Sequence, residues 1–184
     1  MLTRDEALSL LKENLKEPAL VNHSLEAEAV MRALAEKLGE DADTWGLCGL
    51  LHDIDYSTTK DQPEKHGLMA MDILDGKMPE EVLFAIRAHN AEHTKVEPQS
   101  NLDYALRCGE TVTGLIHTAA LVRPTKMEGM KAKSLKKKMK DKAFAASVCR
   151  DNIRECDKIG LELGDFLTTS IQAITSISEE VGLK

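Results

Sequence analysis

Aromatic residues are scarce in this chain, which has six of them among 184 residues. Single-stranded nucleic acids are usually held by stacking of bases on aromatic rings, so the sequence offers little material for a stacking platform. Basic residues are also outnumbered: 24 Lys and Arg against 31 Asp and Glu give a formal net charge of −7 and a pI of about 5.4. We therefore do not expect duplex nucleic acid as a partner.

Long apolar runs and paired cysteines are missing as well. No run approaches the roughly 20 apolar residues that cross a bilayer, and the N-terminal MLTRDEALSLL carries charges inside its apolar pattern, unlike a signal peptide. The four cysteines contain no CxxC pair, which indicates reduced thiols packed as small hydrophobic residues. These features predict a soluble, cytoplasmic protein without membrane association.

Apolar residues at helical spacing are present along nearly the whole chain, and no segment alternates as a strand would. Thr3 and Glu6 form a capping box for a first helix, and Gly39 ends a second. Further helices are predicted at 41–53, 63–76, 79–93, 101–122, 144–159 and 163–181, with a polar loop at 55–62. The sequence predicts an all-α, single-domain helical bundle of about seven to eight helices.

Five of the six histidines fall within one stretch of 71 residues, and four of these lie on the apolar faces of different predicted segments. Imidazole and carboxylate are ligands of divalent cations, and a helical bundle can direct them inward from several helices. His52 and Asp53 are adjacent, so their side chains diverge by about 100° on a helix. A carboxylate that bridges two ions needs such a divergent neighbour.

A single histidine on an apolar face is more often a hydrogen-bonded core residue than a ligand. Four such imidazoles in one core would leave many buried polar groups to satisfy, whereas bound cations satisfy them together. The sequence therefore favours five ligands, namely His23, His52, Asp53, His66 and His89. His93 is either a ligand or a group beside the ligands or at a solvated helix end, and His117 is expected to be structural.

The order His23, His52-Asp53 and a later acidic residue resembles the HD-domain superfamily of metal-dependent phosphohydrolases, all-α proteins in which H…HD…D supplies the metal ligands. The strings LLHDIDY, PEKHG and AIRAHN are similar to the branch that carries additional histidines and can bind two metals. The resemblance covers roughly residues 18–124. It implies one HD-like domain over 1–184, with a metal-binding core at about 18–124 and a C-terminal helical extension at about 125–184.

The final acid departs from the family pattern. The string ALRCGETVTGLI offers Glu110 where the family has aspartate. Glutamate is one methylene longer, so it could reach the metal from a backbone set further back. Asp103 lies two turns earlier on nearly the same face and is the rival ligand. If neither residue binds, we expect weak metal binding or a single site.

The resemblance implies a phosphohydrolase in which one or two divalent ions activate a water for attack on phosphorus. Catalytic roles are then expected for Asp53, His66 and His89, and Glu110 joins the five ligands above. The metal is open among Mn, Fe, Mg, Zn, Co and Ni. The expected substrate is a small phosphorylated molecule, either a nucleotide or a related phosphoester.

Substrate phosphates need cationic partners, and the candidates are Arg87, Arg123 and Lys60. Eight lysines lie between positions 126 and 142. The simplest interpretation of this run is a solvated helix face, although it also makes a positive surface that could steer an anionic substrate or a polyanionic partner.

Two other functions fit the same residues. Imidazole and carboxylate also suit a di-iron oxygenase, and a pocket without turnover would suit a nucleotide- or metal-binding regulatory module. A homo-oligomer that pairs the exposed faces of the last two helices is compatible with the pattern.

Overall fold

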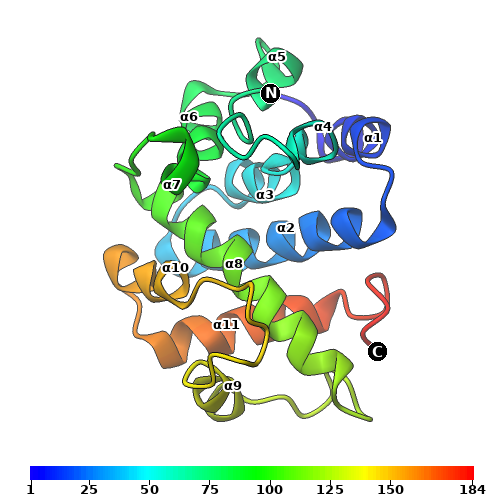
Figure 1. Ribbon diagram of the computed structural model, residues 1–184, viewed down its shortest axis with the longest axis vertical. Coiled ribbons are helices and arrows are strands. Elements are labelled where there is room, and N and C mark those ends of the chain that lie inside the picture. The colour runs from blue at the N-terminus through cyan, green and yellow to red at the C-terminus, as the bar shows by residue number, and fades with distance from the viewer.

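Two long helices form the centre of the fold. In the computed structural model, which describes all residues 1–184, α2 (Pro18–Leu38) and α8 (Asn101–Leu121) cross the middle of the molecule (Figure 1). Helices α3 (Ala42–Leu51) and α11 (Leu163–Ser176) pack on α2, and α6 (Glu80–His89) packs on α8. The other elements are α1 (Arg4–Asn14), α4 (Tyr56–Thr59), α5 (Ala70–Leu74), α7 (Ala91–Thr94), α9 (Ala132–Lys138), α10 (Arg150–Arg154) and a 3₁₀ segment, η1 (Glu155–Ile159).

The predicted all-α bundle is confirmed. The structure contains no strand, and seven of its helices span seven residues or more. One hydrophobic core runs from Ala7 near the N-terminus to Leu183 near the C-terminus, so the chain folds as a single unit. The predicted capping box of the first helix is present, with the Thr3 side chain accepting from the Glu6 N–H. None of the helices combines the length and hydrophobicity of a bilayer-spanning segment.

The helix predicted from Pro63 is wrong in its first half, where residues 63–69 form turns and α5 begins only at Ala70. The reason lies at Gly67, whose φ of +86° cannot be continued as a right-handed helix. A side chain there would also meet the Ile86 carbonyl oxygen, since a Cβ would stand 2.7 Å from it. The turn therefore lets the segment approach the end of α6 closely.

Other predicted boundaries also differ, and the last helix ends at Ser176 and not at residue 181. The expected loop at 55–62 contains the short helix α4, and the expected helix at 79–93 is broken at Asn90, where φ is −104° and ψ is 41°. His89 and His93 consequently lie on different helices.

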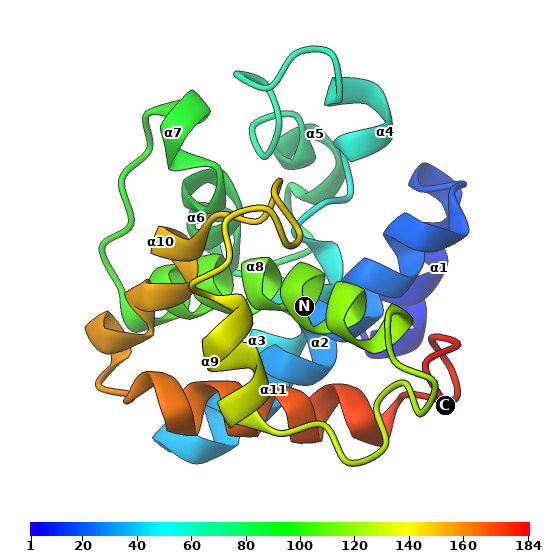
Figure 2. The same ribbon diagram turned by 60° about the horizontal axis from the view of Figure 1, so that its bottom comes forward.

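The helix predicted at 144–159 begins only at Arg150. The Arg150 guanidinium donates to backbone carbonyls of the preceding loop, those of Asp141, Phe144, Ala145 and Val148. These bonds fix an irregular segment between α9 and α10, which passes in front of α8 in Figure 2.

Candidate metal centre

Close packing of α3 on α2 brings the first two histidines together. A Cβ at Gly49 would stand 2.7 Å from the Ala27 carbonyl oxygen, so the two helices approach at backbone distance only because this residue is glycine. His23 projects from α2 and His52 from the C-terminal end of α3. Their Nε2 atoms lie 3.2 Å apart.

A second pair of histidines forms on the other side. His66 lies in the turn before Gly67, and His89 ends α6. The Nε2 atoms of His66 and His89 lie 3.1 Å apart. The glycine that interrupts the predicted helix is therefore the residue that allows this pair to meet.

Asp53 lies between the two pairs. Its Oδ1 is 3.3 Å from His52 Nε2 and 3.0 Å from His66 Nε2. Its Oδ2 is 3.6 Å from His23 Nε2, and His89 Nε2 is 3.6 Å from Oδ1. The five residues thus form two three-residue groups that share Asp53, each of a kind able to hold a cation.

Hydrogen bonds fix which ring nitrogen of each histidine carries the proton. His52 Nδ1 lies 2.8 Å from the Gly49 carbonyl oxygen and His89 Nδ1 lies 2.6 Å from the Ile86 carbonyl oxygen. A carbonyl oxygen only accepts, so each Nδ1 must donate. In each neutral ring the Nε2 atom then carries no proton and offers a free lone pair.

The other two histidines are held in the same way by side chains. His66 Nδ1 lies 2.9 Å from Asp55 Oδ1, which accepts. His23 Nδ1 lies 2.8 Å from Thr113 Oγ1, and that hydroxyl donates its own proton to the Glu110 carbonyl oxygen at 2.7 Å. The hydroxyl must therefore accept from His23, so all four rings present Nε2 to the centre of the cluster.

The donor set fits divalent cations. Two unprotonated nitrogens that face each other at 3.1 and 3.2 Å repel, unless positive charge lies between them. Nitrogens that bind one ion at about 2.0–2.1 Å stand roughly 2.8–3.0 Å apart as neighbours in octahedral geometry and roughly 3.3–3.4 Å apart in tetrahedral geometry. The observed distances of 3.1 and 3.2 Å lie between these two ranges and are compatible with nitrogens that share a cation.

The electrostatics of the cluster agree with this. Burial lowers the pKa of His52 to about 3, so its ring stays neutral and ready to bind. Burial raises the pKa of Asp53, but the surrounding histidines outweigh it and hold that pKa well below its usual value. For His66 burial lowers the pKa, as it does for His52, but hydrogen bonds to Asp53 and Asp55 outweigh burial and raise the pKa to about 10. In the metal-free chain a proton on His66 thus supplies positive charge that a metal ion would displace.

The other predicted ligands lie at different distances from the cluster. Glu110 Oε2 is 3.9 Å from His23 Nε2, beside the first group but outside it. Burial and the nearby Asp53 carboxylate raise the pKa of Glu110 to about 8. Asp103 is not brought to the cluster, because its Oδ2 accepts from the N–H groups of Gln99 and Ser100 as part of the cap of α8.

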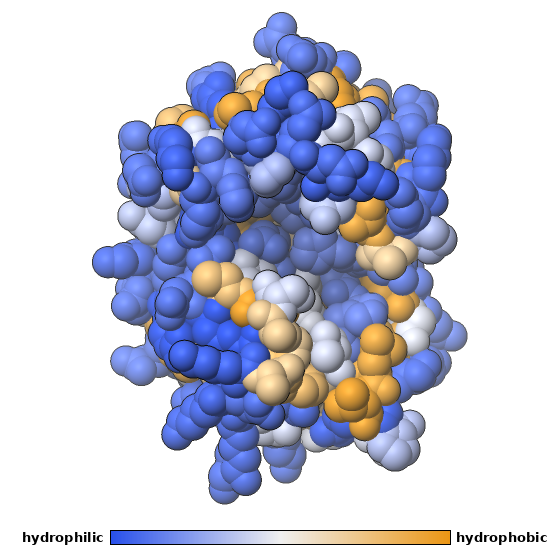
Figure 3. Space-filling model, viewed as in Figure 1, coloured by the Kyte–Doolittle hydropathy of each residue, from blue (hydrophilic) through white to orange (hydrophobic).

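A cleft of about 480 Å³ opens beside the cluster. Its lining includes His23, Glu110 and the exposed His93, together with residues of the segment before α10, Ser147, Val148 and Cys149. Figure 3 shows this face of the molecule hollowed across its middle, with mostly hydrophilic residues at the floor. The cleft gives solvent a route to candidate ligands that are themselves largely buried.

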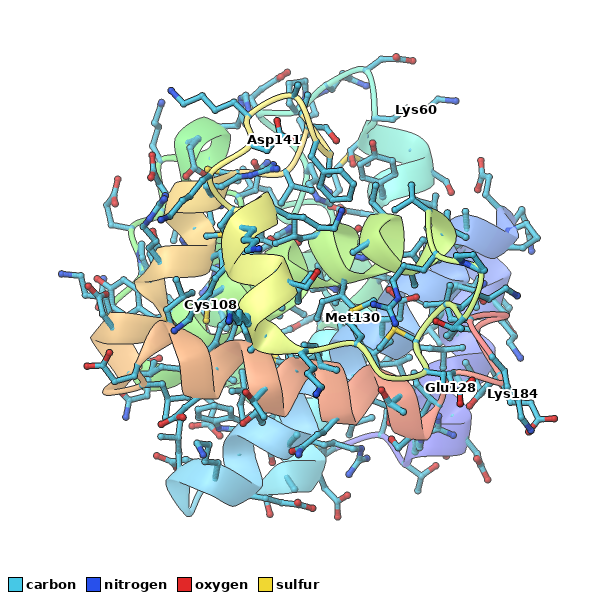
Figure 4. All side chains as sticks on the ribbon, turned by 90° about the horizontal axis from the view of Figure 1, so that it is seen from below. Lys60, Cys108, Glu128, Met130, Asp141 and Lys184 are labelled. Carbon is cyan, nitrogen blue, oxygen red and sulfur yellow. The ribbon has the colours of Figure 1, made fainter.

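The three predicted phosphate-binding residues do not line this cleft. Arg87 pairs with Glu80 and lies over the Phe84 ring, and Arg123 donates to the Lys126 carbonyl oxygen beyond the end of α8. Lys60 follows α4 and lies at the outer edge of the molecule (Figure 4). His117, expected to be structural, donates from Nδ1 to the buried Glu26.

Sequence reasoning missed three residues that hold the cluster in place. Asp55 lies in the segment predicted as a loop, yet it is 1% exposed and also accepts from the N–H groups of Gly67 and Ala70. Thr113 fixes the proton position of His23. Arg107, 3% exposed, donates to the carbonyl oxygen of His89 at 2.9 Å. Only Asp55 carried a signal, as an acid two residues after Asp53.

Comparison with known proteins agrees with this arrangement. A family model described as "HD domain" matches residues 20–122. Ribonuclease Y of Desulfotalea psychrophila is 28% identical over 172 residues, which cover 88% of this chain and 32% of that protein. The chain therefore spans about a third of the length of this curated relative. No solved structure matches.

Proposed function

The chain belongs to the HD domain family of metal-dependent phosphohydrolases, and we propose that it hydrolyses a phosphoester bond of a nucleotide or related molecule with two divalent ions. One observation carries the proposal: four histidines whose Nδ1 atoms are occupied direct their Nε2 lone pairs at one another, with Asp53 between them. In a purely structural cluster, buried acceptor atoms are ordinarily paired with donors and do not face one another.

The residues divide into two ligand sets. His23 and His52 would hold one ion, His66 and His89 the other, and Asp53 would contribute an oxygen to both. Glu110, beside His23, would complete the first set. When bound, the ions would lower the pKa of a coordinated water and neutralise charge on the phosphoryl oxygens.

The composition of the cleft makes phosphate binding depend on the metal ions. No lysine or arginine lines it, so its only cationic side chains are histidines. Binding of a phosphate there depends on charge bound at the cluster, which links substrate affinity to metal content. Asn90, His93 and Asn152 line the same cleft and offer polar side chains for the rest of the substrate.

The relative in Desulfotalea psychrophila supports a phosphodiester as the bond that is broken, since it carries the name of a ribonuclease. The match lies below 30% identity and covers a minor part of that protein. For this chain we propose phosphoester hydrolysis as the reaction, with diesters of nucleotides as the first substrates to test.

The direct test is hydrolysis by chelator-treated protein before and after each of Mn²⁺, Fe²⁺, Mg²⁺, Zn²⁺, Co²⁺ and Ni²⁺ is restored. The panel contains bis-p-nitrophenyl phosphate, p-nitrophenyl phosphate, nucleoside monophosphates and cyclic nucleotides. We expect phosphate-ester cleavage that is lost on chelation and regained with metal. Full metal loading without turnover on the whole panel would contradict the proposal, and oxygen uptake by the iron-loaded protein would assign the same ligands to an oxygenase.

A further inference from the structure

Positive charge is concentrated in one short segment of this acidic protein. Residues 123–142, which we call the lysine surface, contain nine basic and two acidic side chains and carry a net charge of +7. The whole chain carries −7, so the other residues carry −14. An asymmetry of this size between two parts of one domain indicates an anionic partner for the basic part.

The lysines of this surface have no acidic partners. None of the salt bridges in the structure involves any of the eight, whereas Arg4, Arg32 and Arg107 elsewhere are all paired with carboxylates. Leu135 and Met139 are buried and anchor α9. Six lysines, at 131, 133, 136, 137, 140 and 142, are consequently exposed to solvent.

A groove of about 280 Å³ lies at one end of the lysine surface. Arg123, Lys131, Lys133 and Lys137 line it with the Ser134 hydroxyl, and none of its lining residues is hydrophobic. The Arg123 guanidinium is held in place by the Lys126 and Glu128 carbonyl oxygens. The groove therefore groups four cations, one of them with a fixed orientation, as a phosphate group requires.

The chain itself links the lysine surface to the metal centre. Residues 139–149 continue from α9, with Asp141 on this loop (Figure 4), and run along α8 to α10 (Figure 2). Arg150 fixes this segment through its bonds to the backbone carbonyls of the loop. The far end of the segment, at Ser147, Val148 and Cys149, lines the catalytic cleft.

The lysine surface and the cleft beside the metal cluster are separate, and this separation constrains the kind of ligand that could use both. The cleft contains no lysine or arginine, and its lining shares no residue with that of the basic groove. One small phosphorylated molecule in the cleft would leave the lysine surface unused. A chain of linked phosphates could occupy both places at once.

We propose that the lysine surface binds a single-stranded polynucleotide and that its backbone follows residues 139–149 into the cleft. This inference rests on the proposed phosphoesterase function and names its substrate class. A single strand fits because the reacting phosphate must reach ligands that are nearly buried, with His52 0% and Asp53 8% exposed. Aromatic residues are few, so the strand is held by its phosphates, without base preference and with a steep dependence on salt.

The test compares two quadruple variants of the full chain, both in an Asp53→Asn background that removes cleavage. One replaces Lys131, Lys133, Lys137 and Lys140 by glutamine, and the control replaces the exposed Lys12, Lys16, Lys37 and Lys77. Both lose four positive charges. Fluorescence anisotropy measures binding of labelled single strands of about 4 to 20 nucleotides, as RNA and as DNA, at several salt concentrations.

The parent should bind the longer strands more tightly, with log K falling against log salt by about 0.7 for each phosphate contacted. The variant without Lys131, Lys133, Lys137 and Lys140 should bind at least about ten-fold more weakly, and the slope of log K against log salt should become about 2.8 less steep. The affinity of the control variant should stay within about two-fold of that of the parent. Binding of RNA and DNA alike supports the proposal. Equal loss in the two variants, no dependence on strand length, or tighter binding to phosphatidylserine vesicles or to duplex would overturn it.

A parallel assay with bis-p-nitrophenyl phosphate separates this inference from the proposed function. The same quadruple variants are made with Asp53 intact, and both should cleave this small diester at the parental rate. If the parent with Asp53 intact fails to cleave it, the phosphoesterase function fails, whatever the strand-binding result. If the parent cleaves it but the quadruple lysine variant binds strands as tightly as the parent does, the phosphoesterase function stands and only the inference fails.

Discussion

Two polar clusters meet at His89, the last residue of α6, and they are built in opposite ways: one bonds its carbonyl oxygen and the other contains its ring. Arg107, on α8, donates to Glu92 at 2.7 Å, to Glu155 at 2.7 Å and to the His89 carbonyl oxygen at 2.9 Å. Its guanidinium cation is surrounded by carboxylate and carbonyl acceptors, which raise its pKa further above the ordinary value although burial lowers it. The chain supplies every partner that this cluster needs.

The cluster around Asp53 has the reverse composition. It contains four imidazoles and one carboxylate, and each outer nitrogen has an acceptor from the chain. The inner Nε2 atoms have only one another and Asp53. The Arg107 cluster therefore contains a permanent cation, whereas the positive charge of the Asp53 cluster is a proton on His66 that a bound metal ion could replace.

Loss of the shared carboxylate should have the largest effect. Asp53→Asn keeps the shape but removes the charge that both ligand groups use, so hydrolysis should fall by at least about 1,000-fold, or roughly 4 kcal/mol in barrier height. Asp61→Asn, at an exposed position in the same part of the chain, is the matched control and should retain the parental rate. Steady-state rates with saturating metal measure both variants, and equal rates would show that Asp53 takes no part in hydrolysis.

Arg107→Leu should act on stability rather than on chemistry alone. Removing the buried cation leaves Glu92 and Glu155 without a partner, but these carboxylates are 53% and 24% exposed and regain water. The expected cost is therefore about 1.5–3 kcal/mol of unfolding free energy, the range for hydrogen bonds to a charged group. Arg154→Leu removes an exposed pair with Asp151 and should cost less than about 1 kcal/mol. Urea unfolding of the metal-free proteins compares the two, and similar losses would refute the structural role of Arg107.

Thr113→Val tests whether the proton position of His23 matters. Without the hydroxyl, His23 Nδ1 loses its acceptor and the ring can present the wrong nitrogen, which should weaken metal binding by about 10- to 100-fold. Thr118→Val, on the same helix, removes a hydroxyl that bonds only to the Gly114 carbonyl oxygen. Metal titration by calorimetry should show no change in this control, and an unchanged Thr113→Val would contradict the assigned proton position.

Metal affinity should rise with pH, and its slope reports on Glu110. The metal-free chain holds a proton on His66 up to about pH 10 and on Glu110 up to about pH 8. Metal binding needs both groups deprotonated, so about two protons should leave at pH 7 and about one between pH 8 and 10. Calorimetry in buffers of different ionisation enthalpy counts them. In Glu110→Gln about one should leave at pH 7, and an unchanged count would show that Glu110 is not a ligand.

The residues that the structure brings together in the cluster could be predicted from the sequence, whereas the residues that orient their side chains could not. His23 and His89 were found because helical periodicity places them on apolar faces. Thr113 lies 90 residues from His23, and nothing in the spacing of either indicates that their side chains meet. The structure places His66 beside His89, but in a turn and not on the predicted helix, because the left-handed Gly67 turn depends on contact with α6.

The central claim is that Nε2 lone pairs of four histidines converge on Asp53 to bind cations, and metal stoichiometry tests it most directly. Chelator-treated protein is titrated with Mn²⁺ or Co²⁺, freed of excess metal, and measured by elemental analysis. We expect about two ions per chain in the parent and a marked loss in Asp53→Asn. A parent chain that retains no metal after saturation would contradict the account.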